Sequence, residues 1–361
     1  MYPKSVYQLN KEETMKKYFL KALIVALMSV SLAACGGKTE QTVENTGTKP
    51  AEAQKEDKKE ENITLRLAHS QSPEHLINTT ANKFADLVKE KSSGSITINV
   101  FPGETMGTSA EMADAVSAGD VDFYIASTGQ FTQRYKPFSI IEAFYMFRDK
   151  DHLFKFYESD SFNTLKEGLA EECNVHILAP VYYGSRQMTT SKAALKNPKD
   201  INGLKMRAAN EPMPIAAFEA LGATPTPIAY NETYLALQQG VADGQENPPM
   251  SILAMKFYEV QQYLNITDHQ YQMMNIFMSD ACKQGLSEEQ FNIVLSAAKE
   301  AAEEHNKAAI EEENKAIEEL GKHLEIVETD KAAFAEMMKP MYEKFKTDWV
   351  EGMYEDIQAI K

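Results

Sequence analysis

The residue types that most often do chemistry are present in this sequence, but they do not form a known catalytic or metal-binding motif. The seven histidines never lie at metal-ligand spacing from one another. There is no glycine-rich phosphate loop, no G-x-S-x-G elbow and no H-E-x-x-H motif, and the dinucleotide fingerprint fails because Gly103 and Gly107 have no third glycine in place. We therefore expect a protein that is not an enzyme and has no cofactor and no metal. An enzyme with scattered catalytic residues stays open as an alternative.

The cysteines also match no metal or redox motif. Cys173 and Cys282 are far apart in the sequence, so they could form a disulfide in an exported protein or be two buried thiols. A folded part of this size needs no crosslink for its stability, and we therefore favour buried thiols.

Three polar residues, His69, Ser70 and Ser127, follow segments that are patterned as strands. The first part of the chain alternates strand and helix, which implies a parallel sheet with helices on its faces. In such sheets ligands bind beyond the carboxyl ends of the strands, so these three residues are candidates for a binding site. The expected strands are 63–68, 96–100 and 121–125, and the expected helices are 76–91 and 110–118.

The same alternation starts again near Asn174, and we therefore predict a second sheet and a two-lobed α/β fold. Strands are expected over 175–180, 204–208 and 224–228, with helices over 213–221 and 231–239. In the last third, Ser287 and Gln290 have the spacing of a capping box, which predicts a long helix running to about Leu320.

Composition excludes two classes of function. The chain has 361 residues and a net charge of -16, and a nucleic-acid-binding protein would need a basic face. There is one long apolar run, so a protein that spans the membrane several times is excluded as well.

That apolar run, Ala22–Ala34, follows three lysines and has the length of a signal-peptide core rather than of a membrane span. It leads into Leu-Ala-Ala-Cys-Gly-Gly, which resembles the lipobox of bacterial lipoproteins, with Cys35 as the lipidated residue. Residues 1–35 are thus predicted to be a signal peptide, and Met15 is a more usual start than Met1. We expect the mature chain to lie outside the cytoplasm, with a lipid anchor on a bacterial membrane.

Residues 36–62 contain almost no large apolar side chains, so they cannot bury enough surface to fold. We predict a disordered tether, which as a flexible coil would span roughly 30 Å.

Four blocks in the middle of the chain are the most informative part of the sequence. In order they are GSRQMTTS (184–191), NGLKMR (202–207), YNETYLALQ (230–238) and GVADGQENP (240–248). Together they resemble the solute-binding component of tripartite ATP-independent periplasmic (TRAP) transporters, the DctP-like family. A fainter likeness extends from about Ile63 to the carboxyl end.

The resemblance implies two α/β lobes, joined by crossing segments and a long helix, with the ligand held in the cleft between them. It also implies roles for individual residues: Arg207 as the arginine that binds the ligand carboxylate, Arg186 as a second arginine of the cleft, Asn247 as a further carboxylate ligand, and Tyr230 as the aromatic residue against the ligand body. Asn210 joins this group as a candidate ligand-binding residue.

Each of these residues has an alternative interpretation. Either arginine could belong to a structural ion pair, Asn247 could serve the turn before Pro248, Tyr230 could be part of the core, and His69 could be a surface histidine. For the lobes we predict residues 63–183 with about 271–310, and residues 184–270 with about 311–361.

The central blocks are most similar to those of sialic-acid binders, notably residues 187–191 and 256–260. Two positions differ from that subgroup, because Thr108 or Ser109, and Ala126, stand where we expect acidic side chains in the first lobe. A hexuronate or aldonate therefore fits better than sialic acid. We predict a monomeric receptor that delivers a sugar acid to TRAP permease subunits, with a C4-dicarboxylate receptor or a ligand-sensing lipoprotein as alternatives.

Overall fold

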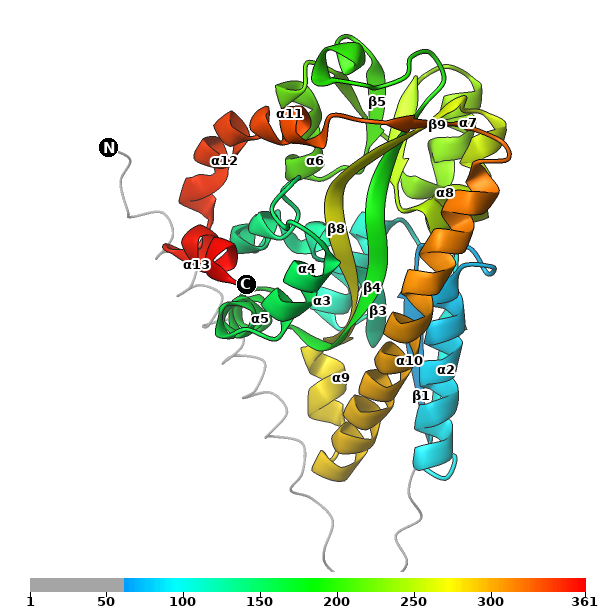
Figure 1. Ribbon diagram of the computed structural model, residues 1–361. Coiled ribbons are helices and arrows are strands. Elements are labelled where there is room, and N and C mark those ends of the chain that lie inside the picture. Colours follow the sequence, from blue (N-terminus) through cyan, green and yellow to red (C-terminus); the bar gives the residue numbers. More distant parts are fainter. Residues whose placement is uncertain (1–61) are drawn as a thin grey trace, which may run out of the picture. The chain divides into compact units, whose positions relative to one another are not determined.

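The computed structural model describes residues 62–361 (Figure 1). The predicted signal peptide, Cys35 and nearly all of the predicted tether lie outside the described residues.

One mixed sheet, rather than the two predicted sheets, forms the centre of the described part. Along residues 62–361 eight of its nine strands follow the order β2-β1-β3-β8-β4-β7-β5-β6, and the ninth, β9, pairs with β8. The strands are β1 (Ile63–His69), β2 (Ile96–Phe101), β3 (Phe123–Ser127), β4 (Val175–Thr190), β5 (Lys205–Ala208), β6 (Thr224–Pro227), β7 (Gly244–Asn247), β8 (Tyr263–Ser279) and β9 (Glu325–Glu328).

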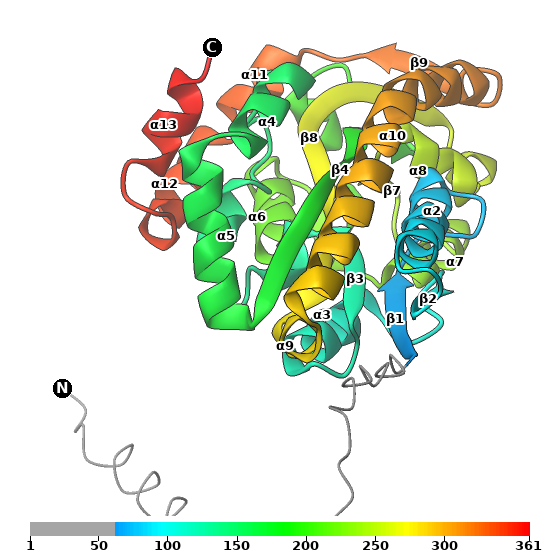
Figure 2. The ribbon, with the colours of Figure 1, turned by 90° about the horizontal axis from the view of Figure 1, so that it is seen from below.

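Two long strands are the reason why the sheet is continuous. The antiparallel strands β4 and β8 have 16 and 17 residues and run side by side through the whole body (Figures 1 and 2). At one end β8 pairs with β3 of the parallel β2-β1-β3 group, and at the other β4 pairs with β7 of the β7-β5-β6 group. We call these two ends the first lobe and the second lobe. The residue boundaries given above for the lobes remain a prediction.

The long helix is confirmed. Helix α10 (Glu288–Leu320) starts at Ser287, whose side chain accepts from the Gln290 backbone while the Gln290 side chain accepts from the Ser287 backbone. Figures 1 and 2 show α10 lying across β4 and next to α2 (Leu76–Lys91). Its buried face consists largely of alanines, which let the neighbouring backbones approach closely.

The remaining helices cover the faces of the sheet, and the last of them form the carboxyl-terminal segment. They are α3 (Ser109–Ala118), α4 (Lys150–Tyr157), α5 (Asp160–Cys173), α6 (Pro212–Ala220), α7 (Thr233–Gln238), α8 (Pro249–Ala254), α9 (Asp280–Gly285), α11 (Lys331–Glu336), α12 (Lys339–Phe345) and α13 (Met353–Ala359). In the last segment, α12 contacts α6 of the second lobe and α13 contacts α5 on the first-lobe side. The two lobes are therefore also connected by the carboxyl-terminal helices.

The body has a large apolar core, in which Cys173 and Cys282 are both buried and unpaired, as the favoured interpretation predicts. Within residues 62–361, none of the helices combines the length and the apolar composition that a membrane span requires.

Candidate ligand-binding site

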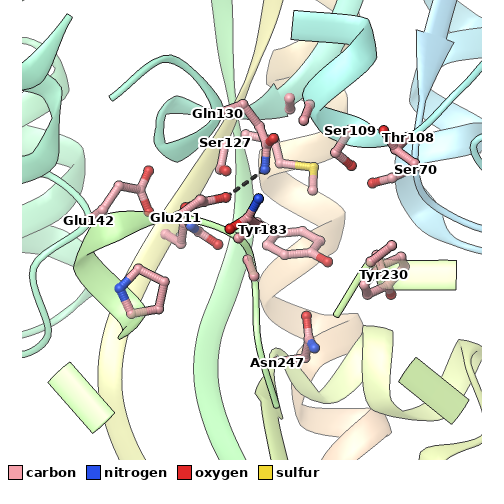
Figure 3. Close-up of a pocket in the computed structure, with 18 of the residues that line it drawn as sticks. Ser70, Thr108, Ser109, Ser127, Gln130, Glu142, Tyr183, Glu211, Tyr230 and Asn247 are labelled. Carbon is pink, nitrogen blue, oxygen red and sulfur yellow. Dashed lines mark hydrogen bonds between the residues drawn. The ribbon is translucent and has the colours of Figure 1, made fainter. Parts of the chain in front are cut away.

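A cavity of about 390 Å³ lies between the lobes, against the crossing strands (Figure 3). This volume is in the range of about 300–1,000 Å³ that is usual for small-molecule sites. Most of the residues predicted from the sequence lie in its wall, namely Ser70, Ser127, Arg186, Arg207, Asn210, Tyr230 and Asn247. The strand pattern explains why these distant residues meet: most of them end a strand or follow it closely, and parallel strands bring their carboxyl ends to one edge.

Arg207 lies in the wall of this cavity at the end of β5 and is only 3% exposed. Its Nε and Nη2 both donate to the Ile228 carbonyl oxygen, at 3.0 and 2.8 Å, and its guanidinium carbon lies 6.0 Å from the centre of the Tyr230 ring. Among residues 62–361 no carboxylate pairs with it, and burial lowers its pKa. A buried guanidinium in this state is suited to an anion supplied by a ligand.

Arg186 lies in the same wall, and it forms an ion pair with a carboxylate of the protein. Its Nε and Nη2 donate to the two carboxylate oxygens of Glu246, with an Nη2–Oε1 distance of 2.8 Å. The Glu246 carboxylate also contacts His269 Nε2 at 3.1 Å. Burial alone would raise the pKa of Glu246, but Arg186 and His269 hold it at about 2. The ion-pair alternative that the sequence left open thus describes Arg186 and not Arg207.

Asn247 contacts Arg186, and Tyr230 lies next to Arg207. Asn247 Oδ1 accepts from Arg186 Nη2 at 3.2 Å, and its Nδ2 donates to Gln245 Oε1 at 2.6 Å. The Tyr230 hydroxyl donates to Gln71 Oε1 at 3.1 Å, which joins the second lobe to the first across the cavity.

His69 does not line the cavity. It is buried, and its Nε2 lies 3.2 Å from Asn78 Oδ1 at the start of α2. Burial lowers its pKa to about 4, so the ring is neutral at neutral pH. The last residue of β1 points to the helix, and the next residue, Ser70, reaches the cavity.

Thr108, Ser109 and Ala126, the neutral residues singled out in the first lobe, do line the cavity. Two acids of the same lobe that the sequence interpretation missed, Glu104 and Glu142, line it too. The sequence showed no signal for Glu142, which lies in the irregular segment after a short 3-10 helix (Lys136–Ile140).

Glu142 is held by four donors. Its Oε1 accepts from the Thr128 hydroxyl and from the Gly129 N–H at 2.9 Å, and its Oε2 accepts from the amide nitrogens of Gln270 and Gln272, both at 2.7 Å. Protein donors therefore reach both carboxylate oxygens of Glu142.

Glu211 of the second lobe is a further acid that the sequence interpretation missed, although it directly follows Asn210. Its Oε1 accepts from Gln130 Nε2 of the first lobe at 2.5 Å, as Figure 3 shows. Burial, with Glu142 nearby, raises the pKa of Glu211 to about 8. The cavity is therefore lined by two arginines and four glutamates (Glu104, Glu142, Glu211 and Glu246).

Comparison with known proteins accounts for this combination of fold and cavity. The model of the DctP family, described as bacterial extracellular solute-binding protein family 7, matches residues 67–348. The chain belongs to this family. It is thus an extracytoplasmic solute-binding protein and not an enzyme.

Relatives of this family 7 protein cover most of its length. The 2,3-diketo-L-gulonate-binding periplasmic protein YiaO of Escherichia coli is 32% identical over 278 residues, which are 76% of this chain and 84% of YiaO. A TRAP periplasmic solute-binding protein of Sulfitobacter, solved with β-D-galacturonate, is 26% identical with a TM-score of 0.78, covering 81% of this chain and 97% of that one.

A third relative, a TRAP periplasmic solute-binding protein of Sulfurospirillum deleyianum, was solved with succinate. It is 28% identical with a TM-score of 0.79, and the match covers 83% of this chain and 100% of that one. The two-lobed fold expected from the sequence is therefore the fold of the family.

Proposed function

We propose that this protein captures a sugar acid outside the cytoplasm, with Arg207 bound to the ligand carboxylate, and delivers it to the membrane subunits of a TRAP transporter. The observation that carries this proposal is the buried Arg207, which faces the cavity without a carboxylate partner among the described residues. Its planar guanidinium can bind a carboxylate at two points.

The rest of the wall suits a body rich in hydroxyl groups. Ser70, Ser127 and Gln130 of the first lobe are neutral donors and acceptors, and the amide of Asn210 lies in the second-lobe wall. Each hydrogen bond to a sugar hydroxyl would contribute on the order of 1 kcal/mol. The relatives that bind diketogulonate and galacturonate support a ligand of this class.

A C4-dicarboxylate is the second candidate, because one relative was solved with succinate. Both ends of a dicarboxylate would need cations, but Arg186 is paired with Glu246, and the wall of this cavity contains neither lysine nor histidine. These charges favour a ligand with one carboxylate.

Mass spectrometry of ligand carried through purification, followed by calorimetry, tests the ligand class. The panel is glucuronate, galacturonate, gluconate, sialic acid, succinate and malate. We expect saturable binding of at least one sugar acid and none of succinate or malate. Binding of succinate or malate alone would contradict the sugar-acid assignment and leave the receptor role intact.

We further propose that the mature chain is a monomer. We also propose that it is tethered to the membrane through lipid on Cys35, because the sequence around Cys35 has the lipobox pattern behind a basic and apolar leader. Stable anchoring requires more than one acyl chain, which a lipoprotein cysteine can carry. Cys35→Ser should therefore release the protein from membranes in a fractionation experiment. Cys173→Ser is the matched control and should stay with the membrane; equal retention of both variants would refute the anchor.

A further inference from the structure

Glu211 differs from the other three glutamates of the cavity wall in how few protein groups bind its carboxyl group. Glu246 is paired with Arg186, Glu142 has four donors, and Glu104 accepts from the Ser109 backbone and side chain. Among residues 62–361, Glu211 has a single donor, Gln130 Nε2, on one of its two oxygens.

The position of Glu211 is set by both lobes. It precedes α6 in the second lobe, and its carboxyl group reaches the 3-10 turn Thr128–Phe131 of the first lobe. A Cβ atom at Gly129 would overlap this carboxyl group, so the turn can lie against Glu211 only because residue 129 is glycine. Gly129 also donates to Glu142 through its backbone, and the two acids therefore meet at one turn. Figure 3 shows Glu142 and Glu211 on the same side of the pocket.

The charges around the cavity oppose the ionisation of Glu211 once a ligand is bound. The charged groups that act on it are Arg186 (β4), Arg207 (β5), Glu246 (β7) and Glu142, and Tyr124 (β3) and Glu104 lie nearby. The two arginines balance Glu246 and Glu142. A ligand carboxylate adds one negative charge to this buried space, and an ionised Glu211 would add a second one without a compensating cation.

We propose that Glu211 is a specificity-determining residue that is a neutral carboxylic acid in the complex and donates its proton in a hydrogen bond to a ligand oxygen, and that an ionised Glu211 takes up one proton from solvent when the ligand binds. This inference rests on the proposed function, because the incoming carboxylate at Arg207 is what favours the proton. No bond of the ligand is broken; the proton moves from water to a Glu211 carboxylate oxygen.

A defined pH dependence follows. Because burial raises the pKa of Glu211 to about 8 in the empty cavity, the acid is already neutral below that pH and binding needs no proton. Above pH 8 the empty protein must first be protonated, so the affinity falls by up to tenfold for each pH unit until the pKa of the complex is reached.

Calorimetry with the sugar acid that binds best tests the proposal. The Kd of the wild-type protein should be constant from pH 6 to 7.5 and rise up to tenfold between pH 8.5 and 9.5. Glu211→Gln keeps the shape of the neutral side chain and a hydrogen-bond donor, so its Kd for the sugar acid at pH 6.5 should lie within about threefold of the wild-type value. The Kd of this variant should not rise at alkaline pH. Glu313→Gln is the matched control, because Glu313 on α10 is a buried carboxyl group outside the cavity wall whose pKa is also raised, to about 7; it should keep the rise.

A second readout does not depend on a variant. Binding heats of the wild-type protein at pH 8.5, measured in two buffers with different ionisation enthalpies, should reveal the uptake of up to one proton per ligand. A flat wild-type profile, absent proton uptake, or an unchanged rise in Glu211→Gln would each overturn the role of Glu211. Absence of sugar-acid binding at pH 6.5 would instead overturn the proposed function.

Discussion

The two arginines of the cavity have the same side chain and similar burial, but their surroundings differ. Around Arg186 the protein supplies the anion itself, through Glu246, and the side-chain oxygens of Gln272 and Asn247 accept further hydrogen bonds from the guanidinium. Around Arg207 it supplies a backbone carbonyl group and an aromatic ring, both of which are neutral. A buried charge without a charged partner is costly, so this comparison separates an arginine that the protein neutralises from one that, under the proposed function, a ligand carboxylate would neutralise.

The largest expected effect is on stability, at Arg186. Arg186→Met would leave Glu246 buried without its ion-pair partner, and we expect the free energy of unfolding to fall by about 3–5 kcal/mol. Denaturant unfolding measures this loss. The double variant Arg186→Met with Glu246→Gln removes the unpaired charge as well and should recover most of it. A loss below about 0.5 kcal/mol in the single variant would contradict the structural role of this pair.

The next effect is on binding, at Arg207. Arg207→Ala should weaken sugar-acid binding by roughly 2–5 kcal/mol, because the ligand carboxylate loses its buried partner. Arg207→Lys should also bind more weakly, since an ammonium group cannot offer two parallel donors. Calorimetry decides the point, and thermal unfolding checks that both variants fold. Wild-type affinity in Arg207→Ala would show that the arginine is structural, and would remove the contrast with Arg186.

The smallest effect concerns the residue beside Arg207. Tyr230→Phe keeps the ring under the guanidinium but loses the hydrogen bond to Gln71 that joins the lobes. We expect the affinity to fall by about 0.5–1.5 kcal/mol, because closure of the lobes around the ligand is less favourable. Tyr234→Phe is the control, since its hydroxyl bonds to Glu259 away from the cavity wall. Equal affinities of the two variants would mean that the Tyr230–Gln71 contact does not contribute to capture.

Local structure could be predicted well from the sequence, because its signals are local. The capping box at Ser287 predicts the start of α10, and the alternation of strand and helix from Ile63 predicts β1, α2, β2, α3 and β3 to within a few residues. The sequence missed β8 and the full length of β4, since their pairing joins segments about 90 residues apart that carry no local signal of each other. The prediction of two sheets failed for this reason.

By itself the sequence determined that this chain is a solute receptor of the TRAP type, and it correctly predicted most of the candidate residues that line its cavity, Arg186 and Arg207 among them. Only the tertiary structure decided what each arginine contacts. Glu246 reaches Arg186 because antiparallel pairing of β4 with β7 sets Met188 opposite Glu246, 60 residues after the arginine. The same packing brings Glu142 and Glu211 to one turn and keeps His69 out of the cavity wall. The charge state of a buried group depends on the neighbours that folding brings to it, and these neighbours come from distant parts of the chain.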